Sequence, residues 1–398
     1  MSDMETREVK LGNIVKHNKG YAFKSSDYTD EGVMVVRVTD FTLDSISDAD
    51  AVYLAPDDRY DKFILKTNDI LIQTVGSWAN NPNSIVGKVV RVPKQCDNAY
   101  LNQNIVRIIP NNDLDNTYLF YALKANHFST YCVLRGQGAA NQASITLDTI
   151  FRFKFKAHNF TAQKRIAGIL SAYDNLIENN NKRIRLLEQM AENIYKEWFV
   201  RFRFPGYEDM EFDGTLPIGW QYQPISESMD FFDSQRVPLS SMQRDEMEKI
   251  YPYYGAAKLM DYVDDYLFDG EYLLLGEDGT VVNTEGFPVL QLVNEKFWVN
   301  NHAHVIRGKG HISTRFLYLT FCRFPITGVV TGSAQPKISK GRLEKLKILV
   351  PDAIRMEHFN NMINPMFDEI NVLKKQVMRI TKQRDMLLPR LMSGKLEV

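Results

Sequence analysis

The feature that most restricts how this chain can fold is a heptad pattern over residues 161–199. Apolar residues recur there at alternating steps of four and three, and Gly168 is the only glycine. Such a seam winds one helix against a partner helix. At 1.5 Å rise per residue the helix would be roughly 58 Å long, which exceeds the core of one small domain. The seam positions are Ile166, Leu170, Tyr173, Ile177, Asn180, Ile184, Leu187, Ala191, Ile194 and Trp198.

The same seam returns at a constant offset of 193 residues, as from Ile166 to Phe359. The matching positions are Phe359, Ile363, Met366, Ile370, Leu373, Val377, Ile380, Arg384, Leu387 and Leu391. A period shared over so many positions indicates a duplication. The alternative is two unrelated amphipathic helices, each packed on its own domain.

The repeat extends into the segments that precede the two helices. The segment WVNNHAHVI (298–306) matches YLNQNIVRI (100–108) at an offset of 198 residues. After a five-residue deletion the offset becomes 193, which places Gln335 on Gln142. Two such copies imply pseudo-two-fold symmetry, with the long helices packed antiparallel.

We therefore expect an α+β fold made of two mixed α/β domains separated by a long antiparallel two-helix coiled coil. The expected parts are a first domain at 1–158, a central helix at 159–203, a linker at 204–215, a second domain at 216–351 and a distal helix at 352–398. Within the first domain, short apolar runs predict strands at 33–38, 69–77, 85–92 and 104–109, and a buried helix at 117–123. Residues 149–158 alternate aromatic and basic side chains, which predicts a half-buried strand leading into the helix.

Two prolines interrupt the second seam. Pro365 stands where the first copy has Ala172, and it predicts either a helix start at Asn364 or, as we favour, a kink or short break. Pro389 predicts the end of the helix, which would leave Leu391 outside it.

Two seam positions are polar, Asn180 and Arg384. A lone polar residue in a heptad core fixes register or orientation at a cost in stability. The alternative is that each side chain lies at an open part of the coil and is solvated.

Composition places the chain among globular proteins of two or three domains, with 398 residues, 44% hydrophobic and 24% charged. The sequence contains no apolar run of eighteen residues and no apolar signal core, so we expect neither a membrane span nor export. Three widely spaced cysteines fit a reducing cytoplasm. The net charge of −1 neither predicts nor excludes nucleic-acid binding, which depends on local patches.

Catalytic motifs are missing from the sequence, which contains no phosphate-binding glycine loop and no nucleophile elbow. His302 and His304 have the spacing of one strand face, but His302 aligns with Asn104 of the first copy, which favours a polar structural role. Glu277 and Asp278 are possible nuclease ligands without an evident partner set. We therefore predict no catalytic and no metal-binding residues in this chain.

Several stretches together resemble the specificity (S) subunit of type I restriction–modification systems. QKRIAGILSAYDNLI follows the first globular part and LLPRLMSGKL closes the second. The other stretches are, in chain order, KGYAFKSSDY, LPIGW, YPYYGA, VNNHAHVI and TGSAQPKIS. The resemblance implies two target-recognition domains, each reading one half of a bipartite double-stranded DNA site. It also implies a helical spacer that docks two methyltransferase subunits and the motor-nuclease (restriction) subunits. S-adenosylmethionine, ATP and Mg would then bind the partner subunits, and this chain would hold no cofactor.

The duplication also separates framework residues from base-reading residues. Side chains shared by the copies, such as Asn102 and Asn300, are expected to be framework or phosphate contacts, and loop residues that differ are the candidates for base contacts. The candidates are Gln73, Ser77, Trp78, Asn80, Asn81, Gln137 and Asn141 in the first copy, and Gln235, Arg236, Tyr254, Lys258, Glu277, Asp278 and Ser333 in the second. Phosphate contacts are expected from Lys24, Lys88, Arg135, Arg236 and Lys337.

The polar face of the first helix is a further expected contact. Its basic residues, Lys164, Arg165, Lys182, Arg183 and Arg185, form either a docking surface for the catalytic subunits or an ordinary solvated face. Two other functions compete with DNA recognition. One is a coiled-coil scaffold that binds only protein, and the other is a self-contained metal-dependent nuclease.

Overall fold

The computed structural model describes residues 6–42, 44–78, 84–125, 127–138, 142–332 and 335–397. The chain forms two compact units, which we call unit 1 (Met1–Glu178 with Val377–Val398) and unit 2 (Asn179–Gln376). Each long helix therefore contributes one part to unit 1 and the other part to unit 2. Among the described residues, no helix is both long and apolar enough to cross a membrane.

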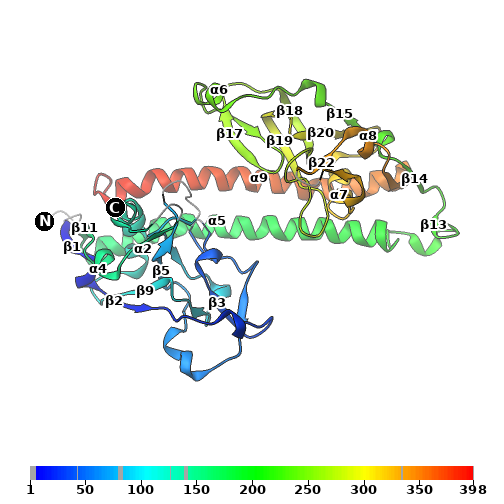
Figure 1. The fold of residues 1–398 in the computed structure, drawn as a ribbon. Helices are drawn as coiled ribbons and strands as arrows, with labels where there is room; N and C mark the ends of the chain where they lie inside the picture. The colour runs from blue at the N-terminus through cyan, green and yellow to red at the C-terminus, as the bar shows by residue number, and fades with distance from the viewer. Residues whose placement is uncertain are drawn as a thin grey trace. The chain divides into compact units, whose positions relative to one another are not determined.

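Unit 1 begins with short strands, continues into the start of the first long helix and also includes the end of the second long helix (Figure 1). Its elements are β1 (Thr6–Lys10), α1 (Leu11–Ile14), β2 (Val15–Lys19), β3 (Val33–Val36), β4 (Val52–Leu54), β5 (Ile70–Gln73), β6 (Val75–Gly76), β7 (Val89–Arg91), β8 (Tyr100–Leu101), β9 (Ile105–Pro110), α2 (Asn116–Ala125), α3 (Phe128–Arg135), β10 (Ala143–Ser144), α4 (Leu147–Phe151), β11 (Lys154–His158) and α5 (Phe160–Tyr195).

Unit 2 contains the end of α5, which continues as a π-helical turn at Lys196–Val200, and most of the second long helix. Its elements are β12 (Phe212–Asp213), β13 (Leu216–Pro217), β14 (Gln221–Pro224), β15 (Met229–Phe231), α6 (Ser241–Asp245), β16 (Tyr251–Tyr254), β17 (Leu259–Val263), β18 (Phe268–Gly276), β19 (Leu290–Val299), β20 (Ala303–Gly308), α7 (Thr314–Phe321), β21 (Val330–Thr331), β22 (Lys337–Ile338), α8 (Lys340–Leu343), β23 (Lys347–Val350) and α9 (Ala353–Met392).

The main sheets of the two units have the same strand order. Unit 1 pairs its strands as β2-β9-β5-β7, and unit 2 pairs β15-β20-β18-β19 and then adds β16 and β17. A parallel pair follows in each, β3 with β8 and β16 with β19. Leu101 of β8 and Val299 of β19, which are 198 residues apart, pair with Val36 and Tyr254 respectively. In unit 1, Pro93 and a 3-10 turn at Lys94–Cys96 separate β7 from β8, so this part forms a second sheet.

The start of each long helix is built alike. Strand β11 pairs antiparallel with β1, and β23 pairs antiparallel with β14. Asn159 caps α5 by accepting a hydrogen bond from the Ala162 N–H (2.9 Å), and Asp352 caps α9 by accepting from the Arg355 N–H (3.1 Å). The predicted duplication thus covers the sheets, the short helices and the long helices.

Two local predictions were wrong. Residues 147–151 form helix α4, not strand, because Thr146 accepts a hydrogen bond from the Thr149 N–H and caps a helical turn before β11 starts. The linker predicted at 204–215 contains β12, which pairs with β13.

The second wrong prediction concerns the two prolines. Helix α9 runs without a break through Pro365 and ends at Met392, beyond Pro389. Both proline rings lie on the exposed side of the helix, so the carbonyl groups that lose a partner face water. Leu391 is consequently helical and only 1% exposed.

Candidate nucleic-acid interface

The shared asparagines hold the same backbone turn in both units. The Asn102 side chain is 6% exposed and that of Asn300 is 5% exposed. Asn102 Oδ1 accepts a hydrogen bond from the Asn104 N–H (3.4 Å), and Asn300 Oδ1 accepts from the His302 N–H (2.9 Å). These side chains stabilise the turn between strands and are not available to DNA, which fits the framework role predicted for them.

Next to this turn, the same two backbone hydrogen bonds define equivalent positions. The Thr74 N–H donates to Asn104 O (2.9 Å), as the Glu277 N–H donates to His302 O (2.8 Å). Thr74 O in turn accepts from the Ile145 N–H, and Glu277 O accepts from the Ile338 N–H. Thr74 and Glu277 therefore occupy one place in the repeated fold, and so do Asn104 and His302. The backbone is repeated here while the side chains differ.

In unit 2 this place carries a partly buried ionic cluster. Arg236 donates to Glu277 Oε2 (2.7 Å) and to Ala303 O (2.7 Å). His304, which is 1% exposed, hydrogen-bonds Asp233 Oδ2 through Nδ1 (2.7 Å). Burial opposes ionisation of Asp233, but the hydrogen bonds from His304 and from the backbone, together with Arg236, hold the pKa of its carboxyl below the usual range.

Asp233, Glu277 and His304 lie close enough together to form a metal-binding set. Their contacts argue against that use. Nδ1 of His304 faces a carboxylate and Nε2 lies 2.9 Å from Ile338 O, so both ring nitrogens are already engaged in hydrogen bonds within the protein. The Arg236 guanidinium already supplies the positive charge next to Glu277. We assign no metal to this cluster.

Above the cluster lies an exposed layer of polar side chains. The Lys337 Nζ is 3.4 Å from Glu277 Oε1, and the Lys337 side chain is 50% exposed. His302 Nδ1 hydrogen-bonds Asp278 Oδ1, and the His302 side chain is 47% exposed. The predicted residues Arg236, Glu277, Asp278 and Lys337 thus come together, with His302 as a member that we had not predicted as a DNA contact.

In unit 1, two predicted DNA contacts are buried. Gln73 is 0% exposed at the end of β5, and its amide donates to Val75 O (2.9 Å) and Ser84 O (3.1 Å). Lys88 is 6% exposed, and burial lowers the pKa of its ammonium group. Gln73 is the last residue of β5, within the strand predicted at 69–77, and is therefore not a loop residue. Burial removes both Gln73 and Lys88 from our candidates for direct contact.

Four other predicted residues of unit 1 converge around β6 and β10. Ser77 forms a bridge with Ile85, and Gln137 forms a bridge with Ser144, next to the pairing of these strands. Trp78 lies beside Gly136, since a Cβ atom built on this glycine would lie 3.5 Å from the Trp78 indole ring. Arg135 places its guanidinium 4.1 Å from the centre of the Tyr131 ring. This group is the unit 1 candidate for the DNA-facing surface.

The remaining predicted residues are scattered. Lys24 in unit 1, and Gln235 and Lys258 in unit 2, are exposed. The Tyr254 hydroxyl is half-buried and donates to Glu295 Oε1 (2.8 Å), which commits it to a structural contact. Asn80, Asn81, Asn141 and Ser333 lie outside the described residues.

Comparison with known proteins identifies the family. The family model described as the type I restriction modification DNA specificity domain matches residues 1–189 and 217–357, once over each copy of the repeat. The chain belongs to this family, the specificity subunits of type I restriction–modification systems.

Individual specificity subunits are similar over most of their length. The type I restriction enzyme MjaIX specificity subunit of Methanocaldococcus jannaschii is 26% identical over 75% of this chain and 73% of its own. The MjaVIII specificity subunit of the same organism is 22% identical over 98% of this chain and 92% of its own. The crystal structure of a type I restriction–modification S subunit from M. genitalium has the same fold, with a TM-score of 0.63 at 16% identity, over 98% of this chain and 97% of that one.

The heptad positions of this specificity subunit face inward on both long helices. All of the predicted seam residues are buried or half-buried, Ile177, Leu187, Val377, Ile380 and Leu387 among the half-buried ones. In unit 1, Ile166 and Leu170 of α5 share a core with Leu391 of α9, and in unit 2, Ile184 and Ala191 share one with Phe359, Ile363, Ile370 and Leu373. In each unit the end of one helix therefore packs beside the start of the other, which is an antiparallel pairing.

The two polar seam residues of the specificity subunit have defined partners. Asn180 Nδ2 donates to Gln376 Oε1 (3.3 Å) within unit 2. Arg384 donates to Asp174 Oδ1 (2.7 Å) and Asp44 Oδ2 (3.0 Å) within unit 1. Of the two interpretations left open by the sequence, the solvated one is excluded for Arg384, whose side chain is 11% exposed.

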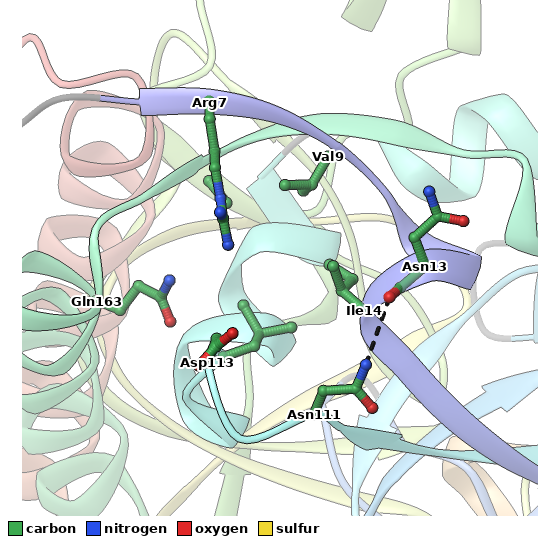
Figure 2. A pocket seen from close by; sticks show the side chains of 9 residues that line it. Arg7, Val9, Asn13, Ile14, Asn111, Asp113 and Gln163 are labelled. Atoms are coloured by element: carbon green, nitrogen blue, oxygen red, sulfur yellow. Dashed lines mark hydrogen bonds between the residues drawn. The ribbon is translucent and has the colours of Figure 1, made fainter.

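A cavity of about 200 Å³ opens in unit 1 next to the start of α5 (Figure 2). Arg7 points into it from β1, Gln163 borders it from α5, and Asn111 donates to Asn13 O on its far side. The predicted DNA contacts are not among its lining residues, which are Arg7, Val9, Asn13, Ile14, Asn111, Asp113, Leu114, Ala157 and Gln163. We therefore place the candidate interface of the specificity subunit elsewhere in unit 1.

Proposed function

We propose that this specificity subunit reads a bipartite double-stranded DNA site, with the sheet domain of unit 1 reading one half and that of unit 2 the other. The observation that supports this proposal is the repeated backbone with different side chains at Thr74 and Glu277. Two copies that hold their framework constant and vary one polar edge are suited to reading two different sequences. The long antiparallel helices then fix the distance between the two readers.

We further propose that the subunit acts as the non-catalytic member of its complex. Two methyltransferase subunits, and the motor-nuclease subunits where restriction occurs, would dock on it in the cytoplasm. The basic residues Lys164, Arg165, Lys182, Arg183 and Arg185 are exposed on α5 and suit such docking. Arg183 is also paired with Glu369 in unit 2. S-adenosylmethionine, ATP and Mg would bind those partners.

A domain exchange tests the two-reader proposal. Residues 216–351 are replaced by the matching segment of a relative, and the chain is purified with its methyltransferase. Duplexes retained from a randomised pool are then sequenced. We expect one half of the retained site to change while the other half and the gap stay as they were. A change in both halves, or retention without any sequence preference, would contradict the proposal.

A further inference from the structure

Asn104 and His302 occupy the same position in the two copies, and this position has the properties of a base reader. Each backbone carbonyl accepts from the residue that follows a neighbouring strand, from Thr74 after β5 in unit 1 and from Glu277 after β18 in unit 2. Each backbone N–H is held by a buried asparagine of the preceding turn. Hydrogen bonds therefore hold both the carbonyl and the N–H of this residue. Its side chain differs between the copies and is not buried.

The neighbouring Asp278 carboxylate favours one tautomer of His302, and this tautomer sets the hydrogen-bonding groups that the imidazole presents. Its Nδ1 faces the Asp278 carboxylate, which accepts hydrogen bonds, so the Nδ1 proton is directed to Asp278. In the neutral imidazole this leaves Nε2 as an acceptor. Asp278 is only 18% exposed, which makes it a support that orients the imidazole, whereas His302 is the accessible member of the pair.

Lys337 supplies a donor next to this acceptor. It forms a bridge with Asp278 on β22, and its ammonium group lies 3.4 Å from Glu277 Oε1. Arg236 donates a hydrogen bond to the other carboxylate oxygen of Glu277, Oε2. The pair Glu277 and Asp278 is therefore a platform that positions one donor, Lys337, and one acceptor, His302, on the exposed edge of unit 2.

A donor next to an acceptor is the complement of a G·C pair in the major groove. Guanine presents the acceptors O6 and N7, and cytosine presents its N4 amino group as a donor. The amide of Asn104, at the equivalent place in unit 1, matches the N6 and N7 of adenine instead. We infer that position 104/302 determines specificity in each recognition domain, with His302 and Lys337 reading a G·C pair and Asn104 reading an A·T pair. This inference rests on the proposed function.

The test exchanges the two side chains. His302→Asn and Asn104→His are made separately in the full chain, which is purified with its methyltransferase and incubated with a randomised duplex pool. We expect His302→Asn to lose its G·C preference at one position of one half-site by roughly 5- to 150-fold, and Asn104→His to lose an A·T preference at one position of the other half. All other positions of the site should stay unchanged.

His311→Asn is the matched control, because His311 is an exposed histidine of unit 2 away from this edge. It should retain the wild-type site. If wild-type protein selects no sequence, the proposed function itself fails. If wild-type protein selects a bipartite site and His302→Asn selects the same one, only the present inference is overturned. Should His302→Asn fail to fold, Lys337→Gln decides, because it must weaken the preference for guanine at that same position.

Discussion

The two places where a recognition domain meets the helix pair are equivalent in backbone and opposite in chemistry. In unit 1, Asp174 of α5 accepts from Arg384 of α9, from Arg91 of β7 and from the Tyr121 hydroxyl of α2. Lys124 of α2 pairs with Asp44 beside them. At the offsets of the repeat, unit 2 has apolar residues in these places, with Cys322 as the most polar one. Asp174 corresponds to Phe367, Arg384 to Ala191, Tyr121 to Leu319 and Lys124 to Cys322.

In unit 2 the arginine that joins the sheet domain to the helix pair comes from the sheet domain. Arg315 of α7 is 8% exposed and donates to Glu271 Oε2 (2.8 Å) and to Asp368 Oδ1 of α9 (2.6 Å). In unit 1 the linking arginine, Arg384, belongs to the helix pair and contacts the sheet domain. In unit 2 the linking arginine, Arg315, belongs to the sheet domain and contacts the helix. Buried ion pairs contribute little net stability, but breaking one is costly. The difference therefore makes the two ends of the helix pair chemically distinct.

Placing an arginine at Ala191 of unit 2, the counterpart of Arg384 in unit 1, should have the largest effect on stability. Ala191→Arg inserts a guanidinium against Phe367 in a core where Ala191 is 0% exposed, and it meets no carboxylate equivalent to Asp174. We expect a loss of more than about 4 kcal/mol in the free energy of unfolding, from overpacking and an unpaired buried charge. Urea unfolding followed by tryptophan fluorescence measures it, since Trp198, Trp220 and Trp298 belong to unit 2. Met190→Arg, on the exposed face, should change the value by less than about 0.5 kcal/mol.

Removing the unit 1 arginine should have the next largest effect. Arg384→Ala leaves Asp174 partly buried with Arg91 and Tyr121 as its remaining donors. We expect a loss of about 2–4 kcal/mol, somewhat below the cost for a fully buried pair. Trp78, the tryptophan of unit 1, reports this unfolding. Equal stability of Arg384→Ala and of the exposed control Lys382→Ala would show that the network is not what holds this end together.

The ionic cluster of unit 2 should give an acid-dependent term that unit 1 lacks at the equivalent place, where Val106 replaces His304. Because the folded-state pKa of Asp233 is depressed, its stabilisation is fully present above the unfolded pKa of about 3.9 and is lost as the pH falls through the folded value. Asp233→Asn should cost about 1.5–3 kcal/mol at pH 7, and the difference from wild type should shrink below pH 4. Asp230→Asn, half exposed in the same unit, should show no comparable pH dependence.

The smallest effect is expected at Asn180, whose counterpart in the repeat is Leu373. Asn180→Leu removes a buried amide and leaves Gln376, which is exposed, to be solvated. We expect a gain of about 1 kcal/mol in thermal or urea stability, because a polar seam residue costs stability in exchange for register. A loss of stability would mean that the hydrogen bond to Gln376 outweighs the apolar packing.

The sequence predicts well which helix residues face inward, and predicts poorly which side chains pair with one another. The heptad spacing predicted the inward face of both helices, since a repeat of ten positions averages out local exceptions. It did not predict that Arg384 is paired with Asp174, because that contact joins residues far apart in the chain. The prolines were misjudged because their effect on backbone hydrogen bonding was considered without the heptad phase, which places Pro365 and Pro389 outside the seam.

For the candidate interface, the repeat was more informative than residue type. Gln73 was chosen for its amide, although the apolar run before it indicated a strand with an inward side chain. His302 was set aside as structural because it aligned with Asn104, yet that same alignment shows that one exposed position changes while its backbone stays. A search for differences at matched positions, not for polar loops, would have found it.

The composition of unit 1 has a consequence for the order in which the protein is made. Its core includes Ile166 and Leu170 from the first half of the chain, and also Leu391 and Met392, which follow unit 2 in the sequence. Unit 2 is one continuous segment, Asn179–Gln376, and its residues are all in place earlier. Unit 2 can therefore fold before the core of unit 1 is complete, because that core needs Leu391 and Met392, which are synthesised after all of unit 2.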